Sequence, residues 1–196
     1  MQAYERMAVY MAELLDLVDE HDNVIGTERR DRIYQMGLHN YRVVGVFLMD
    51  RKKRVLLPTR SMQCSYCPGC FDFSAAGHVH SGETYLQAVK RELSEELGIN
   101  TDNIELHEFL YVKYPNRYGL SSFSKYYYAF YLGGMRKQVG EVSGLQWVPS
   151  ERIQQLVKTK PEHFKSDFPP VFKEFMNTII CNPCIEKETT IGGNSL

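Results

Sequence analysis

The stretch GHVHSGETYLQAVKRELSEELGI, residues 77–99, decides how the rest of this sequence is interpreted. Glu92, Glu95 and Glu96 fall at positions i, i+3 and i+4 of an apparent helix, where side chains are neighbours. Each like-charged pair in that arrangement costs a few tenths of a kcal/mol. The run is therefore either a solvated acidic face or one side of a site that holds something positive.

The opposite side of the same helix is apolar, with residues recurring at helical spacing: Leu86, Val89, Leu93 and Leu97. Ser81 is a candidate N-cap, and Glu83 is expected in the first turn. Gly98 followed by Ile99 is typical of a helix that ends in a left-handed glycine. We expect a helix that starts after Ser81, ends at Gly98 and anchors one face in a core.

The acidic side of this helix has the chemistry of a cation site. At 100° per residue, Glu92 and Glu96 project about 40° apart, with Glu95 adjoining them. Hard divalent cations such as Mg²⁺ and Mn²⁺ prefer carboxylate oxygens as ligands. A bound cation would turn the mutual repulsion of the three carboxylates into a shared attraction.

The full stretch also matches a longer pattern, G-x5-E-x7-R-E-U-x-E-E-x-G-U, in which U is an aliphatic residue. All nine specified positions are filled, by Gly77, Glu83, Arg91, Glu92, Leu93, Glu95, Glu96, Gly98 and Ile99. At average residue usage, a chance match at a given position is on the order of one in 10⁹. This pattern is the Nudix box, and the chain resembles the Nudix hydrolase superfamily over roughly residues 13–180.

The resemblance implies a fold and an activity. The fold is an α/β/α sandwich of the α+β class, with a mixed β-sheet and the box as a loop–helix–loop. The activity is hydrolysis of a diphosphate linkage joined to another moiety, X. By the family pattern, the metal ligands are three carboxylates and one backbone carbonyl: Glu92, Glu95, Glu96 and Gly77. Arg91 and Glu83 are expected to form a structural ion pair that orients the box.

The resemblance also suggests catalytic and substrate-binding residues. A general base must complete the deprotonation of the attacking water, and the candidates are Glu92 and Glu141, with Glu95 beside them in the catalytic cluster. Glu141 is alternatively a solvated loop residue. Four further side chains are candidates for substrate contacts, although each has an ordinary structural reading: Arg60, Arg42, His78 and Arg117.

Outside the box, residues 16–50 and the PTRS segment at 58–61 resemble the isopentenyl-diphosphate-isomerase-like branch of the superfamily. The isomerase acts through a cysteine immediately before a Gly-His pair, and this chain has Ala76 there. We therefore expect hydrolysis rather than isomerisation. The alternatives are an isomerase and a non-catalytic Nudix module that only binds a ligand, although such a module would be expected to lose box carboxylates.

Length and composition predict one domain. The chain has 196 residues, 43% of them hydrophobic, and a net charge of −1. We expect a lead-in at 1–12, a single Nudix domain at 13–182 and a flexible tail at 183–196. The balanced charge argues against nucleic-acid polymers and membranes as partners. We expect a cytoplasmic protein that acts on a small diphosphate and that can form a homodimer.

Secondary structure is expected on both sides of the box. Short strands should flank the EHDN turn within residues 13–28, and a brief helix should end at Gly37. Further strands are expected at 41–49, 55–61, 104–114, 125–134 and 144–149, and helices at 149–159 and 168–180.

Five cysteines fall in two groups, Cys64, Cys67 and Cys70 in one loop and Cys181 and Cys184 near the C-terminus. Free cysteines often pack as small hydrophobic residues. The alternative is a structural Zn²⁺ bound by thiolates from both groups. This site requires the C-terminal helix to end beside the 64–70 loop.

Overall fold

The computed structural model describes residues 13–181 apart from 39, 118–119 and 137–139, and side chains are also left out at 115–117 and 120. Its centre is a six-stranded sheet with β5 (Ala75–His78) paired to β3. The other strands follow the order β6 (His107–Arg117), β7 (Leu120–Phe130), β3 (Tyr41–Met49), β4 (Arg54–Arg60) and β8 (Val142–Pro149). A separate hairpin consists of β1 (Leu14–Val18) and β2 (Val24–Arg29).

The sheet is mixed, as predicted. Strands β3 and β7 run parallel, with Gly45 opposite Tyr126, whereas β4, β5, β6 and β8 pair antiparallel with their neighbours. Because β3 carries three neighbours, it is the strand around which the sheet is assembled.

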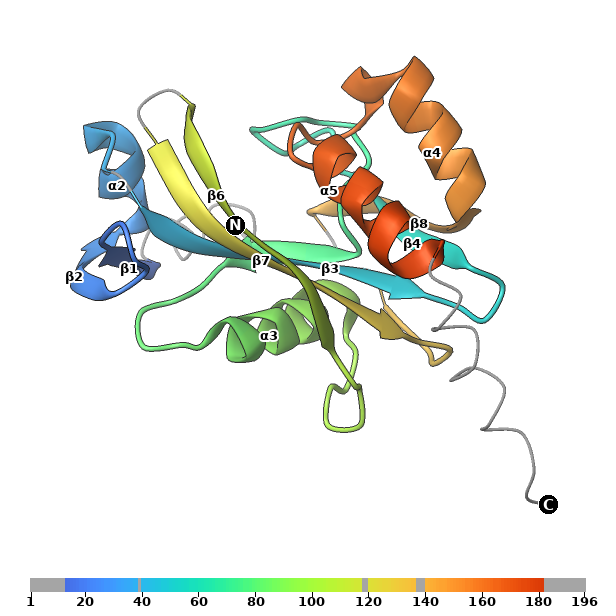
Figure 1. Ribbon diagram of the computed structural model, residues 1–196, viewed down its shortest axis with the longest axis horizontal. Helices are drawn as coiled ribbons and strands as arrows, with labels where there is room; N and C mark the ends of the chain where they lie inside the picture. The colour runs from blue at the N-terminus through green and yellow to red at the C-terminus, as the bar shows by residue number, and fades with distance from the viewer. Residues whose placement is uncertain (1–12, 39, 118–119, 137–139, 182–196) are drawn as a thin grey trace.

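Helices cover both faces of the sheet (Figure 1). One face carries α3 (Tyr85–Leu97). The other carries α4 (Ser150–Thr159), the short helix η1 (Pro161–His163), and α5 (Phe168–Phe175) continued by η2 (Met176–Ile180). A further helix, α2 (Arg30–Met36), follows the β1–β2 hairpin. The predicted α/β/α sandwich is therefore confirmed.

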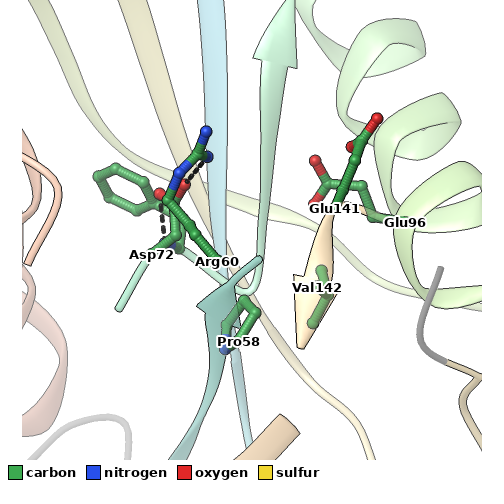
Figure 2. Close-up of a pocket in the computed structure, with 7 residues that line it drawn as sticks. Pro58, Arg60, Asp72, Glu96, Glu141 and Val142 are labelled. Atoms are coloured by element: carbon green, nitrogen blue, oxygen red, sulfur yellow. Dashed lines mark hydrogen bonds and ion pairs between the residues drawn. The ribbon is translucent and has the colours of Figure 1, made fainter. Parts of the chain in front are cut away.

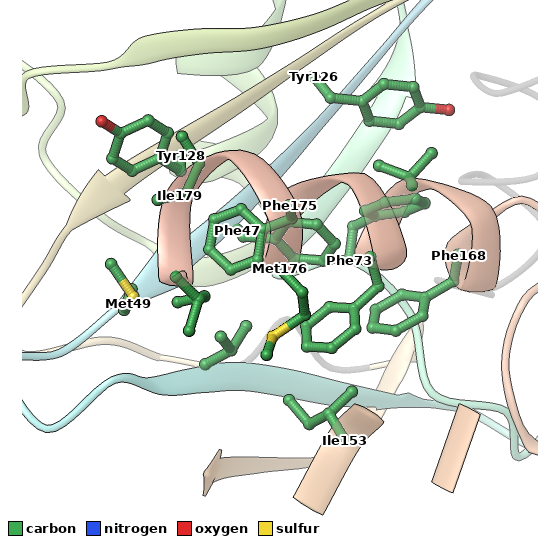
Figure 3. Close-up of a cluster of buried hydrophobic side chains, with 14 of the residues drawn as sticks. Phe47, Met49, Phe73, Tyr126, Tyr128, Ile153, Phe168, Phe175, Met176 and Ile179 are labelled. Atoms are coloured by element: carbon green, nitrogen blue, oxygen red, sulfur yellow. The ribbon is translucent and has the colours of Figure 1, made fainter. Parts of the chain in front are cut away.

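The two faces have different cores. Under α5 the core is aromatic, and Phe47 contacts Phe73, Phe168 and Phe175 at ring-centroid distances of 4.8–5.4 Å (Figure 3). Under α3 the core is mostly aliphatic, with Val44 and Leu93 fully buried. Both faces of β3 are therefore buried, which explains its continuous apolar run.

The start of α3 differs from the prediction. Thr84, rather than Ser81, is the N-cap, and it forms a capping box with Gln87. The Ser81 hydroxyl instead donates to Asp16, and Gly82 turns the chain with a φ of +81°. Glu83 therefore precedes the helix. The prediction for Leu86 was also wrong, because its side chain is 44% exposed at the N-terminal end of the helix.

Helix ends were predicted more accurately. Gly37 and Gly98 adopt left-handed φ values of 62° and 61°, and each ends a helix. The amide of Gly98 donates to the Ser94 carbonyl at 3.0 Å. None of the described helices is both long and apolar enough to cross a membrane.

Candidate active site

Arg91 on α3 organises the acidic residues of the box. Its guanidinium donates to Glu83 at 2.9 and 3.1 Å, to Glu92 at 2.7 Å and to Glu95 at 3.1 Å. It also donates to the carbonyl of His78 at 2.8 Å. Glu83 additionally accepts from the His80 amide at 3.0 Å. This network joins the loop before α3 to the helix, which is the arrangement expected of a structural Arg91–Glu83 pair.

Gly77 lies directly against the Glu92 carboxylate. A Cβ atom built at residue 77 would overlap the carboxyl group of Glu92, so any larger residue would displace it. The sheet fixes Gly77 opposite Val44, and the helix fixes Glu92, whose side chain is 9% exposed. The close approach brings the strand backbone and the carboxylate to one place.

The environment of Glu92 disfavours its charge. Burial raises its pKa to about 7, with further contributions from the negative charges of Glu95 and Glu13, while Arg91 opposes the shift. A carboxylate in this range exchanges protons near neutral pH. The side chain of Glu95, one turn further along α3, is 55% exposed.

A cleft opens between β4, the segment leading to β5, α3 and the start of β8 (Figure 2). Glu96 and Glu141 lie beside one another on one wall, and Arg60 with Asp72 forms the other. Burial raises the pKa of Glu96, and the negative charges of Glu92, Asp72 and Glu141 add to the shift. The structure therefore brings Glu141 beside Glu96, although the two are 45 residues apart in the sequence.

Two residues of this region were missed by sequence reasoning. Asp72 is buried and accepts from Arg60 at 2.7 Å, and Lys165 lies 3.7 Å from Asp72 on its other side. For Asp72 there was a signal, since it is a charged residue between two phenylalanines in FDF. Lys165 carried no such signal, because it lies in a polar loop before α5.

The N-terminal hairpin holds the loop of the box. Asp16 accepts from the Ser81 hydroxyl at 2.6 Å, the Gly82 amide at 3.1 Å and the Thr27 hydroxyl at 3.2 Å. The Ser81 amide also donates to the Leu14 carbonyl at 2.8 Å. The segment between Gly77 and Glu83 is thus tied to the hairpin on one side and to Arg91 on the other.

The remaining substrate candidates are engaged elsewhere. Arg42 donates to Asp22 at 2.7 Å and lies over the Tyr85 ring at 5.5 Å. His78 contacts the Tyr34 hydroxyl at 3.0 Å, and burial together with the charges of Arg30 and Lys165 lowers its pKa. Their contacts with substrate stay a prediction. The side chain of Arg117 lies outside the described residues.

The donor set fits a hard divalent cation, since it consists of carboxylates and a carbonyl crowded into a partly buried site. In the described part of the chain, no three His, Cys, Asp or Glu side chains converge closely enough to hold a metal. Glu92 and Glu95 are instead turned toward Arg91. The candidate ligands are therefore near one another without converging on one point.

The four described cysteines do not gather into the zinc site that was the alternative to ordinary packing. Cys64–Cys70 follow the last residue of β4, whereas Cys181 follows Ile180, whose carbonyl accepts from Lys53 in the turn before β4. Seven extended residues separate these two ends, roughly 20 Å. The required proximity is absent among these four cysteines, and Cys184 lies outside the described residues.

Comparison with known proteins gives the family. The profile of the NUDIX domain matches residues 39–168. The chain belongs to the Nudix family. A crystal structure from Deinococcus radiodurans superposes with a TM-score of 0.69 and 30% identity, covering 82% of this chain and 98% of that one.

Curated relatives place this Nudix protein in the isopentenyl-diphosphate-isomerase-like branch. An uncharacterized Nudix hydrolase of Nostoc is 44% identical over 59% of this chain and 68% of the relative. An isopentenyl-diphosphate Δ-isomerase of Serratia proteamaculans is 28% identical over 84% and 92%. A prenyl-diphosphate phosphatase of Methanosarcina mazei is 26% identical over 87% and 97%. The chain is a Nudix-type hydrolase with isomerases among its relatives.

Proposed function

We propose that this Nudix hydrolase cleaves the diphosphate linkage of a nucleoside diphosphate joined to another moiety, or of a related small diphosphate, using Mg²⁺ or Mn²⁺. The observation that carries the proposal is the crowding of negative charge at Glu96. Burial and the negative charges of Glu92, Asp72 and Glu141 all disfavour its ionised form, and a divalent cation held by the box carboxylates would favour it.

In this proposal the box residues have two roles, metal binding and positioning. Glu92, Glu95, Glu96 and the carbonyl of Gly77 would hold the cation, while Arg91 and Glu83 fix the loop of the box against the helix. When bound, the cation neutralises diphosphate oxygens and lowers the pKa of a water molecule that attacks phosphorus.

We assign the general base to Glu141, because it lines the cleft beside Glu96. Glu92, the other candidate, accepts from Arg91 and packs against Gly77. The carboxylate of Glu141 would take the proton of the attacking water. Arg60 lies on the opposite wall, where its guanidinium can contact a diphosphate oxygen.

Isomerase activity is the competing function, and named isomerases among the relatives favour it. Ala76 argues against isomerase activity, because its methyl group cannot transfer a proton at the position of the isomerase cysteine. A non-catalytic module is disfavoured by the complete box. The phosphatase of Methanosarcina mazei supports hydrolysis within this branch.

The test is a product assay with Mg²⁺ or Mn²⁺ on nucleoside diphosphate sugars, dinucleotides, coenzyme A and prenyl diphosphates. We expect metal-dependent release of phosphorylated products, lost in Glu96→Gln. Double-bond migration in isopentenyl diphosphate would contradict the proposal. So would metal-dependent turnover that survives Glu96→Gln on every substrate. Homodimer formation stays a separate prediction.

A further inference from the structure

The loop at residues 61–70, which follows β4 along the edge of the cleft, carries three thiols: Cys64, Cys67 and Cys70. Each is a free cysteine with a partly exposed side chain. Cys67 and Cys70 flank a Pro-Gly pair in the sequence CPGC. The proposed hydrolysis uses none of these thiols, so their chemistry is open to a separate role.

Cys67 and Cys70 are the first and last residues of a tight turn, because the Cys70 amide donates to the Cys67 carbonyl at 3.3 Å. Pro68 in the second position and Gly69 in the third, with a φ of +75°, are typical of a type II turn. Such a turn keeps its outer Cα atoms within about 7 Å of each other. A disulfide spans Cα separations of roughly 4.4–6.8 Å. The backbone thus holds this pair at a separation that a disulfide can bridge.

The two side chains of the turn are also in contact. Burial raises the pKa of the Cys70 thiol to about 11, and the Cys67 thiol, which is hydrogen-bonded with it, adds to the shift. The Cys70 thiol also donates to the Glu162 carbonyl at 3.8 Å. Cys64 is engaged elsewhere, since its thiol donates to the Glu141 carbonyl at 3.5 Å. The sulfur that faces Cys70 is therefore that of Cys67.

The same turn supports Arg60 on the wall of the cleft. The Arg60 amide donates to the Cys70 carbonyl at 2.9 Å, and the Gly69 amide donates to the Arg60 carbonyl at 3.1 Å. The Arg60 guanidinium donates through Nε to the carbonyl of Tyr66, the residue before Cys67, at 3.0 Å. A change in the turn is therefore passed on to a guanidinium that lines the cleft.

We propose that Cys67 and Cys70 form a reversible disulfide by exchange with a small disulfide such as oxidised glutathione, and that this bond weakens diphosphate binding in the cleft. The bond itself follows from the turn, whereas its effect on binding rests on the proposed function. With both thiols free, the Arg60 guanidinium can leave the Tyr66 carbonyl for a diphosphate oxygen. The disulfide would fix Tyr66 beside a cross-linked turn and retain the guanidinium there.

The exchange needs no further reactant. Cys67 loses its proton and attacks one sulfur of oxidised glutathione, and the glutathione thiolate that leaves takes up the proton. Cys70 then loses its proton and attacks Cys67 Sγ, which releases the second glutathione in the same way. Two protein thiols are oxidised to one disulfide, and one glutathione disulfide is reduced to two thiols. Cys67 reacts first, because Cys70 keeps its proton at neutral pH.

The first test equilibrates the full chain with mixtures of oxidised and reduced glutathione and maps the oxidised cysteines by differential alkylation and mass spectrometry. We expect a bond between Cys67 and Cys70, with a mass loss of two hydrogen atoms that dithiothreitol reverses. Cys70→Ser should instead accumulate one glutathione on Cys67. Cys64→Ser is the matched control, since it removes the third thiol of the loop and should leave this disulfide in place.

The second test compares the binding of inorganic diphosphate to the oxidised and reduced chains by calorimetry with Mg²⁺. We expect the oxidised chain to bind roughly 5-fold or more weakly. Cys67→Ser should show no response to oxidised glutathione. Because coupling between two sites is reciprocal, saturating diphosphate should raise the oxidised glutathione needed for the disulfide by the same factor, at a fixed concentration of reduced glutathione.

Oxidation mapped to any other pair of cysteines, or glutathione on both Cys67 and Cys70 with no bond between them, would overturn the disulfide. Equal diphosphate affinities of the oxidised and reduced chains would overturn its effect on the cleft. Because the disulfide is detected without substrate, its absence is distinct from failure of the proposed hydrolysis, which the product assay reports.

Discussion

The carboxylate of Asp16 on β1 accepts a hydrogen bond of 2.6 Å from the hydroxyl of Ser81, 65 residues further along the chain. This contact ties a hairpin outside the central sheet to the loop that runs from Gly77 to Glu83. Gly77 packs on Glu92, and Glu83 pairs with Arg91. A displacement of the hairpin would therefore shift both ends of the loop that joins Gly77 to Glu83.

Asp16→Asn should therefore weaken metal activation. The amide keeps the shape of the carboxylate, but its NH₂ group cannot accept a hydrogen bond, so the contact with either Ser81 or Gly82 is lost. This loss costs about 1–3 kcal/mol of stability. We expect the Mg²⁺ concentration for half-maximal activity to rise several-fold, and direct Mg²⁺ titration by calorimetry should show the same shift. Asp19→Asn in the same hairpin is the control, since Asp19 bonds only within its own turn among the contacts described. Equal effects of both substitutions would contradict the assigned role.

Gly77→Ala should abolish metal-dependent hydrolysis while leaving the fold intact. The new methyl group would overlap the Glu92 carboxylate and displace it from the site. We expect a loss of at least about 100-fold in kcat/KM, a transition-state cost of roughly 3 kcal/mol. Gly26→Ala is the control, because a Cβ at that position meets no atom within 4 Å. Full activity of Gly77→Ala would remove Gly77 from the proposed metal site.

Much of this local arrangement could be predicted from the sequence. The box identifies Gly77, Glu92 and Glu96 by spacing alone, and Gly98 ends the helix because a left-handed residue is needed there. The start of α3 could not be predicted, because Ser81 and Thr84 are both good caps. Which of them caps depends on Asp16, a partner supplied by the tertiary fold.

The wall of the cleft opposite Glu96 and Glu141 could not be predicted from the sequence either. Asp72, Arg60 and Lys165 come from three segments, and their proximity follows from how β4 and the loop before α5 meet. A pattern within one segment carries no information on such pairing. The zinc alternative for the cysteines met the same limit, since spacing within each group of cysteines says nothing about the distance between the two groups.

In the metal-free protein, loss of the proton from Glu92 should make the free energy of unfolding fall as pH rises from about 4.5 to about 7. Its folded pKa is raised from 4.5 to about 7, so the folded state binds a proton that the unfolded state releases in this window. The contribution is complete below about 4.5 and is lost as pH passes 7, and it amounts to about 3 kcal/mol at most. Mg²⁺ should reverse the loss by stabilising the ionised form.

Urea unfolding in EDTA at several pH values, for the wild type and Glu92→Gln, measures this contribution. His78 acts in the opposite direction, because its pKa is lowered in the folded state and it destabilises the protein as pH falls. Since both proteins contain His78, the difference between their stabilities reports Glu92 together with its effect on Glu96, whose pKa the Glu92 charge raises. A difference that does not change with pH between 4.5 and 7 would contradict the prediction.

Arg91→Lys should destabilise the box even though the charge is kept. A lysine cannot reproduce the planar guanidinium that contacts Glu83, Glu92 and the His78 carbonyl together. We expect a loss of roughly 2–4 kcal/mol in unfolding free energy, since partly buried carboxylates lose their partner. Lys90→Arg, one residue earlier, is the control for surface charge chemistry. Near-wild-type stability of Arg91→Lys would show that the network contributes little.

The two candidate bases can be separated by their effects on metal binding. Glu141→Gln should lower kcat by about 10²- to 10⁴-fold with little change in Mg²⁺ affinity, because Glu141 lines the cleft but does not belong to the box. Glu92→Gln should instead weaken Mg²⁺ binding, since Glu92 is one of the proposed ligands. Single-turnover rates and Mg²⁺ calorimetry on both variants measure the two quantities, with the exposed Glu162→Gln as control. If Glu141→Gln keeps its rate while saturating Mg²⁺ fails to rescue Glu92→Gln, the base is Glu92 and the assignment to Glu141 is wrong.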